Sequence, residues 1–128
     1  MVDWADYKSE AKARGALALE LYVAQSMPTG DPEAVKAVLP DHLAYQAALE
    51  TKGKLAFAGP MSDKSGTQMQ GIGLIIYRAD SLEDARALAD ADPMHQSGAR
   101  SYILRRWMIN EGSFNLSVGL STKSVSFS

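Results

Sequence analysis

The stretch Asp90-Ala91-Asp92-Pro93-Met94-His95-Gln96-Ser97-Gly98 ends one predicted helix and starts a predicted strand. Pro93 cannot continue the preceding helix, and Gly98 allows backbone angles that other residues avoid. One turn therefore holds two carboxylates, an imidazole and a hydroxyl. Two interpretations of this turn stay open: a helix stop followed by a solvated loop, or polar groups that the backbone positions for chemistry.

The segments on both sides of the turn predict a strand, a helix and another strand. A helix that runs to about residue 89 begins at Asp80 or Ser81, and Ser81 followed at the third position by Asp84 resembles a capping box. Before this helix, residues 71–77 form an almost wholly apolar strand, which we expect to be buried on both faces. After the turn, residues 99–109 predict a fourth strand.

The first half of the chain predicts the same order of elements. Residues 17–24 alternate between apolar and polar side chains, and residues 54–60 form a second strand. Between them, a short helical piece at 33–38 precedes a helix from Pro40 to about Lys52. Proline suits the first position of a helix, and the glycine at 53 suits its end.

His42 falls in the first turn of this expected helix, on the same face as Tyr45. Unpaired backbone donors and the positive end of the helix dipole disfavour an imidazolium there. His42 is therefore expected to be neutral and able to accept a proton. The other interpretation is a histidine that packs against Tyr45 or is exposed.

The order strand, helix, strand, strand, helix, strand is typical of an α+β fold, the ferredoxin-like split βαβ. In this fold, an antiparallel sheet carries both helices on one face. We expect one domain over 1–128, with a core at about 17–109, an N-terminal helix at 3–15 and a C-terminal strand or hairpin tail at 112–127. The other face of the sheet carries more apolar surface than a monomer usually exposes to solvent. This predicts a homodimer in which two sheets stack face to face as a dimeric α/β barrel. The alternative is that the chain's own hairpin covers this face.

Composition excludes several classes of function. The chain has no cysteine, so a disulfide framework, a thiolate metal site and a cysteine nucleophile are excluded. The net charge is -2, and the nearest approach to a basic patch is Arg100, Arg105 and Arg106. These arginines alternate in facing, so at most one or two could meet an anionic substrate, and we expect them to be solvated. We therefore expect no nucleic acid partner. No apolar run approaches the ~18 residues of a membrane span, and the acidic N-terminus lacks the order of a signal peptide, so we expect a cytoplasmic protein with no membrane partner.

Several short motifs resemble those of the YciI-like (YCII-related domain) family, over roughly 17–109. They are His42-Leu43-Ala44-Tyr45, Ala48-Leu49-Glu50, Gly53-Lys54-Leu55, Ala58-Gly59-Pro60, Ser81-Leu82-Glu83-Asp84-Ala85-Arg86, Asp90-Ala91-Asp92-Pro93 and Arg106-Trp107. The resemblance implies the dimeric α/β-barrel variant of the ferredoxin-like fold. It also implies a catalytic histidine and aspartate in a pocket, which fall here on His42 and Asp92.

The resemblance implies a type of chemistry without naming a substrate. One protein that the chain resembles is a dehydrochlorinase of a chlorinated hydroxyquinol, and related folds include muconolactone isomerase and heme-handling or quinol monooxygenases. We predict a small-molecule enzyme in which His42, oriented by Asp92, moves a proton in an elimination or isomerisation of a cyclic or aromatic compound, without a cofactor. The alternative is a non-catalytic dimeric module that binds a ligand or a partner protein.

Three further residues are candidates for substrate binding: His95, Tyr45 and Ser97. His95 adjoins the central turn and is either a second acid or base or a residue at the rim of the pocket. Ser97 lacks the motif of a nucleophilic serine. The spacing of His42, Asp92 and His95 matches no recognised metal motif, so we predict no metal.

Overall fold

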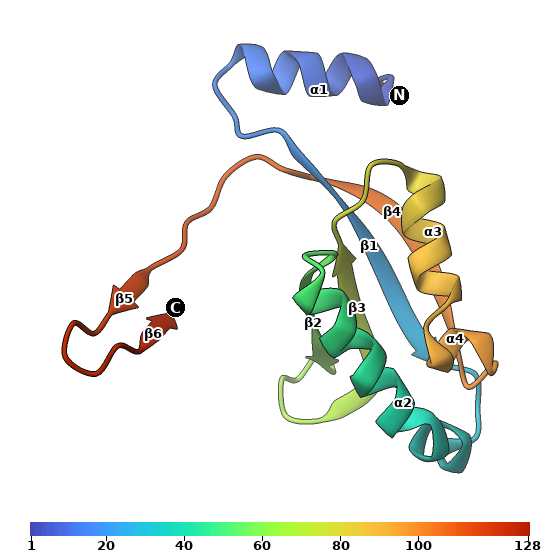
Figure 1. The fold of residues 1–128 in the computed structure, drawn as a ribbon. Coiled ribbons are helices and arrows are strands. Elements are labelled where there is room, and N and C mark those ends of the chain that lie inside the picture. The colour runs from blue at the N-terminus through green and yellow to red at the C-terminus, as the bar shows by residue number, and fades with distance from the viewer. The chain divides into compact units, whose positions relative to one another are not determined.

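The structure, a computed structural model, describes residues 1–128 and divides into two compact units, which are described separately. The larger unit is Glu20–Trp107, and the smaller one combines Met1–Leu19 with Met108–Ser128. Figure 1 shows the elements in chain order, which are α1 (Trp4–Ala13), β1 (Leu19–Pro28), α2 (Pro32–Thr51), β2 (Leu55–Ser62), β3 (Met69–Tyr77), α3 (Leu82–Asp90), α4 (Pro93–Gln96), β4 (Arg100–Ile109), β5 (Leu116–Val118) and β6 (Val125–Phe127).

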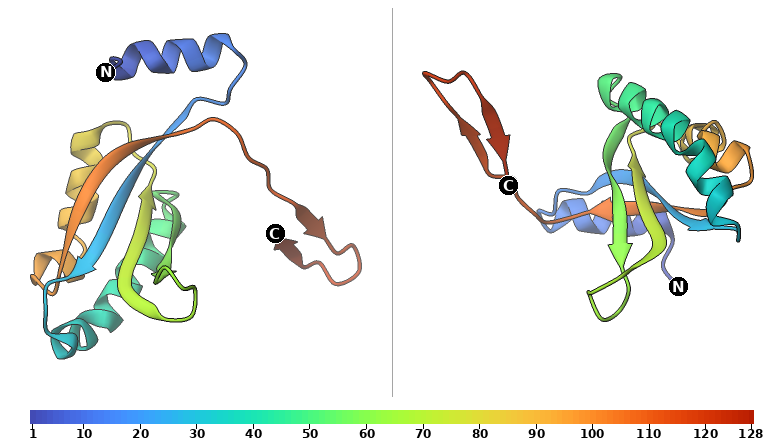
Figure 2. Two further views of the ribbon diagram at one scale, coloured as in Figure 1. Left: turned by 180° about the vertical axis from the view of Figure 1, so that it is seen from behind. Right: turned by 90° about the horizontal axis from the view of Figure 1, so that it is seen from below.

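Four strands form an antiparallel sheet in the order β2-β3-β1-β4. Tyr22 of β1 lies opposite Tyr77 of β3, and Ala58 of β2 lies opposite Ile75 of β3. Helices α2, α3 and α4 cover one face of this sheet, as the two views of Figure 2 show. The predicted α+β, ferredoxin-like arrangement is therefore confirmed.

The core lies between the helices and this face of the sheet. Its buried side chains alternate along β1 and β3 and meet small residues of α3, which let the helix approach closely; they are Tyr22, Ala24, Leu49, Ile75, Tyr77, Ala85 and Ala89. Tyr102 and Leu104 of β4 pack against the same cluster. The period of two along each strand thus places one row of side chains in the core and the next row on the other face.

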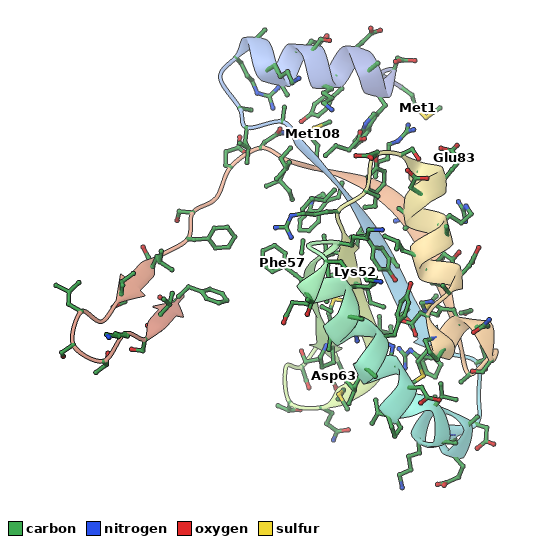
Figure 3. All side chains as sticks on the ribbon, viewed as in Figure 1. Met1, Lys52, Phe57, Asp63, Glu83 and Met108 are labelled. Carbon is green, nitrogen blue, oxygen red and sulfur yellow. The ribbon has the colours of Figure 1, made fainter.

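The other face of the sheet carries large apolar side chains that remain exposed. Phe57 of β2 (Figure 3) is 46% exposed, and Ile103 and Trp107 of β4 are 46% and 44% exposed. Ile103 and Trp107 have the opposite parity to Tyr102 and Leu104, which pack in the core. Exposed apolar surface of this kind marks an interaction surface in many proteins.

Helix α2 corrects the prediction that a helix starts at Pro40. It is one helix of 20 residues, Pro32–Thr51, and Pro40 lies inside it. The true start is at Asp31, whose side chain accepts a hydrogen bond from the backbone N–H of Glu33, while Pro32 takes the first helical turn. His42 is therefore far from the helix N-terminus, and the dipole argument for its protonation state does not apply.

Two other boundaries differ from the sequence-based expectation. Strand β1 continues to Pro28, beyond its predicted end at residue 24, so that Ser26 belongs to the sheet. Residues 93–96 form one turn of helix, α4, in place of the expected loop. The apolar strand β3 is buried only over its last three residues, 75–77, while residues 71–74 are partly exposed.

The smaller unit contains α1 and a separate hairpin. The Asp3 side chain caps α1 by accepting a hydrogen bond from the N–H of Ala5, and Asn110 donates to the Tyr7 hydroxyl over 2.9 Å. Strands β5 and β6 pair in antiparallel fashion, and their apolar side chains are exposed. None of the helices in either unit has the length and apolar character needed to cross a membrane.

Candidate functional site

A cavity of about 360 Å³ opens in the larger unit between α2 and strands β1, β2 and β3. Its apolar wall comes from α2, from both strands of the β2–β3 hairpin and from α4, and includes Val35, Leu39, Leu43, Pro60, Leu74, Ile75 and Met94. Four polar side chains also line it: Ser26, His42, Gln46 and Arg100. An apolar pocket with a few convergent polar groups is typical of a small-molecule site.

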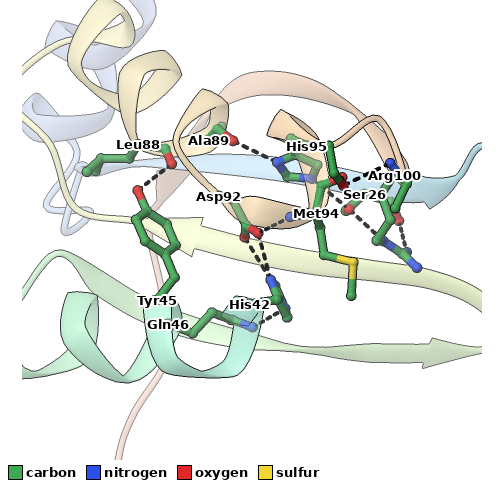
Figure 4. A network of polar contacts seen from close by, with 12 residues as sticks. Ser26, His42, Tyr45, Gln46, Leu88, Ala89, Asp92, Met94, His95 and Arg100 are labelled. Carbon is green, nitrogen blue, oxygen red and sulfur yellow. Dashed lines mark hydrogen bonds and ion pairs between the residues drawn. The ribbon is translucent and has the colours of Figure 1, made fainter. Parts of the chain in front are cut away.

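His42 and Asp92 form a hydrogen-bonded pair beside this cavity (Figure 4). The His42 Nδ1 atom lies 2.8 Å from Asp92 Oδ1 and 2.9 Å from Oδ2. The side chains are 13% and 1% exposed, so the carboxylate lies behind the imidazole and away from solvent. Because an ionised carboxylate only accepts, Nδ1 carries the proton and donates it to Asp92.

Asp92 is held in place by its own backbone as well. Its Oδ1 accepts a hydrogen bond of 2.9 Å from the N–H of Met94, which caps the first turn of α4. The turn is therefore not a solvated loop, and the backbone holds the Asp92 carboxylate beside His42. The same carboxylate caps α4 and fixes the tautomer of His42.

Gln46 occupies the other nitrogen of the ring. It lies one helical turn after His42 on α2, and its side-chain nitrogen donates to His42 Nε2. This contact agrees with the tautomer that Asp92 imposes, because Nε2 is then the acceptor. A substrate proton that reaches Nε2 would have to displace the amide.

A second polar network enters the cavity from β1 and β4. Arg100 Nε donates to Ser26 Oγ over 2.9 Å, and Ser26 Oγ lies 2.9 Å from His95 Nε2. His95 Nδ1 donates to the carbonyl of Ala89 over 2.7 Å. Ser26 Oγ accepts from Arg100, so its one hydroxyl proton is free to be donated to His95 Nε2, which is the acceptor nitrogen of a ring protonated on Nδ1 alone.

Tyr45 and Ser97 lie outside the wall of the cavity. The Tyr45 hydroxyl donates to the Leu88 carbonyl over 2.6 Å, and burial, with a smaller effect of the nearby Asp92 carboxylate, raises the pKa of Tyr45. Ser97 is exposed, and its hydroxyl bonds to the backbone of its own turn. His95 reaches the cavity only through Ser26. Nowhere do three His, Cys, Asp or Glu side chains gather as a metal site would need.

Sequence reasoning missed three of the four polar residues of the wall. Gln46 follows His42 by four residues within the helix predicted at 40–52, so the helix period alone could have placed the two side chains side by side. Ser26 is a polar residue at a core-facing position of β1, a recognisable signal had the strand been extended far enough. Arg100 was expected to be solvated, yet it shares the parity of Tyr102 and faces the core side of the sheet.

Comparison with known proteins agrees with the motifs found in the sequence. The family described as "YCII-related domain" matches residues 7–108. The chain belongs to this family. Two YCII relatives are the uncharacterized protein YjpA of Bacillus subtilis, 30% identical over 55% of this chain and 75% of its own length, and protein YciI of Escherichia coli O6:H1, 34% identical over 65% of this chain and 90% of its own length.

A solved structure supports the YCII fold. It is 5-chloro-2-hydroxyhydroquinone dehydrochlorinase (TftG) of Burkholderia phenoliruptrix AC1100 in complex with 2,5-dihydroxybenzoquinone. It superposes with a TM-score of 0.51 and 23% identity, over 68% of this chain and 92% of that one. The TM-score shows that the two chains share a fold.

Proposed function

We propose that the protein is a small-molecule enzyme in which His42 acts as a general base and Asp92 orients it. The observation that carries the proposal is the pair itself: a buried carboxylate accepts from Nδ1 over 2.8 Å, and the ring lines a cavity of about 360 Å³. The opposite nitrogen, Nε2, is left as the basic atom on the cavity side. The activity of the TftG neighbour, named a dehydrochlorinase, supports elimination as the class of reaction.

The reaction needs no group beyond those in the cavity. His42 Nε2 takes a proton from a ring carbon of the substrate, after the substrate has displaced the Gln46 amide. The C–H electron pair then forms the new double bond, and a leaving group departs with its own bonding pair. In an isomerisation, the same nitrogen returns the proton to another carbon. Asp92 stabilises the imidazolium that forms in between.

Solvent exchange tests this base without a known product. Ring compounds with an acidic C–H, such as lactones, cyclic ketones and chlorinated hydroxyquinols, are incubated in D₂O, and NMR measures the loss of each proton signal. Removing a general base lowers the rate by about 100- to 10,000-fold, so we expect His42→Gln to abolish exchange and Asp92→Asn to slow it. Gln96→Ala, on the exposed side of α4, is the matched control.

Two outcomes contradict the proposal. If His42→Gln exchanges a compound as fast as the wild type, His42 is not the base. If compounds bind in the cavity but none exchanges, the chain is better described as a non-catalytic module that binds a ligand, the alternative that the sequence left open.

We also propose that the protein is a homodimer joined through the face of the sheet opposite helices α2, α3 and α4. The support is the exposed apolar surface on the two edge strands of the sheet, Phe57 on β2 and Ile103 and Trp107 on β4. Analytical ultracentrifugation should find a dimer that Trp107→Glu converts to monomer. Lys64→Glu, in the exposed β2–β3 loop, is the control, and a monomeric wild type would refute the assembly.

A further inference from the structure

Arg100 lies in the cavity wall without a carboxylate partner. Its guanidinium donates from Nη2 to the Ser26 carbonyl over 2.7 Å and to the Gly71 carbonyl, and from Nε to Ser26 Oγ over 2.9 Å. No Asp or Glu oxygen lies within ion-pair distance of it. Neutral oxygens therefore hold this cation, and its charge is not neutralised by an ion pair in the protein.

One edge of the guanidinium remains open. The Nη1 atom donates no hydrogen bond to the protein. The polar side-chain atoms that are buried without a partner are the Tyr77 hydroxyl and Asn110 Oδ1, so Nη1 is not a buried atom. Nη1 is therefore accessible, and Arg100 lines the cavity. A cation in the wall of a mostly apolar cavity gains most from an anion that displaces water there.

The open edge is held in a fixed orientation. Gly71 has a φ of +89°, a conformation that suits glycine, and it presents its carbonyl to Nη2. Ser26 is 3% exposed and is itself bonded to His95, whose other nitrogen is tied to the Ala89 carbonyl. The guanidinium plane is thus fixed before any ligand arrives, which lowers the entropic cost of binding.

We propose that Arg100 is the anion-binding residue of this cavity, and that the cavity takes a small ring compound bearing a carboxylate or another anionic oxygen, held by the Nη1 edge. This inference rests on the proposed function, because it assigns a substrate class to the same site. The apolar wall contacts the ring, and Arg100 selects for its charge. A base and an anion site in one cavity fit a substrate whose acidic C–H lies near an anionic oxygen.

Benzoate and benzamide test the charge preference, because they have nearly the same size and differ in charge. Titration followed by amide NMR should show benzoate binding at least ~10-fold more tightly than benzamide, the factor expected for a charge-assisted hydrogen bond. Arg100→Gln should remove this preference, and Arg100→Lys should keep part of it. Arg105→Gln, an exposed arginine on the same strand, should leave it unchanged.

The variants' amide spectra show whether the fold is retained, so lost binding is not confused with lost structure. Equal affinity for benzoate and benzamide, or a preference that survives in folded Arg100→Gln, overturns the inference. So does benzoate binding with no shift in the signals of Ser26 and Gly71. His42→Gln separates the two proposals: benzoate binding that persists in this variant, with no proton exchange in the wild type, supports the anion site and contradicts the enzyme.

Discussion

Replacing Asp92 separates its structural role from its orienting role. Asp92→Ala removes the cap of α4 and the acceptor of His42 together, in a side chain that is 1% exposed. A cap contributes about 1 kcal/mol, and a hydrogen bond to a charged group about 1.5–3 kcal/mol. We therefore expect the free energy of unfolding to fall by about 3 kcal/mol.

Asp92→Asn should cost less, because asparagine caps helices about as well as aspartate. Its carbonyl oxygen can keep the bond to the Met94 N–H, so only the charge assistance of the His42 contact is lost, about 1 kcal/mol. Its amide then donates to His42 Nδ1, and the ring adopts the opposite tautomer, with the proton on Nε2. The variant therefore keeps most of its stability, while proton transfer is slowed because the favoured tautomer no longer has a basic Nε2.

Urea unfolding followed by far-UV circular dichroism measures both losses, and ¹⁵N NMR of the ring nitrogens reads the tautomers. His95 is the internal control, because its Nδ1 bonds to the Ala89 carbonyl and should keep its proton in every variant. Equal losses of stability in Asp92→Ala and Asp92→Asn would show that the cap contributes nothing. A proton that stays on His42 Nδ1 in Asp92→Asn would refute the orienting role.

Further predictions concern two buried tyrosine hydroxyls and a glycine with a positive φ. The Tyr77 hydroxyl is buried without a partner, so Tyr77→Phe should raise the free energy of unfolding by about 1 kcal/mol, whereas Tyr45→Phe, which loses a hydrogen bond, should lower it by a similar amount. Burial raises the pKa of both tyrosines above 10.0. The free energy of unfolding, measured with urea at a series of pH values, should therefore be constant up to pH 10.0 and fall as the pH rises further. The double Phe variant should lose less stability over the same range. Gly71→Ala should lower thermal stability more than Gly98→Ala, because both have positive φ but only the Cβ at 71 meets another side chain, 3.2 Å from Pro28 Cγ.

The fold could be predicted from the sequence because its signals are local. Alternation of apolar residues marks each strand, and the Ser81 side chain caps α3 by accepting from the N–H of Asp84, as the capping box predicts. The order of these elements then leaves few ways to form a sheet. The start of α2 was missed because two prolines, Pro32 and Pro40, both suit the first turn of a helix. The helix starts at Pro32 because the Asp31 side chain caps it there, by accepting from the N–H of Glu33.

The site could be predicted only in part, because its contacts join distant segments. The hydrogen bond between His42 and Asp92 spans 50 residues, and only the family resemblance pointed to that pair. The argument from helix position concerned the protonation of His42 alone, and it fails because the helix starts earlier. The contact between Arg100 and Ser26 spans 74 residues. This contact forms because β1 and β4 are neighbours and because β1 extends to Pro28. The turn-forming residues near Pro28 led to a predicted strand end at residue 24, before Ser26.

The two polar networks of the cavity supply complementary groups, a basic nitrogen and a fixed cation. In one, Asp92 fixes the proton of His42 on Nδ1 and leaves a basic nitrogen. In the other, Ser26 fixes the guanidinium of Arg100 and leaves two N–H groups. A base that removes a proton next to an anionic oxygen adds negative charge to the substrate, and a fixed cation stabilises that charge most in an apolar cavity. Losing Arg100 should therefore weaken binding of the anion and slow its deprotonation together, whereas losing His42 should affect only the proton.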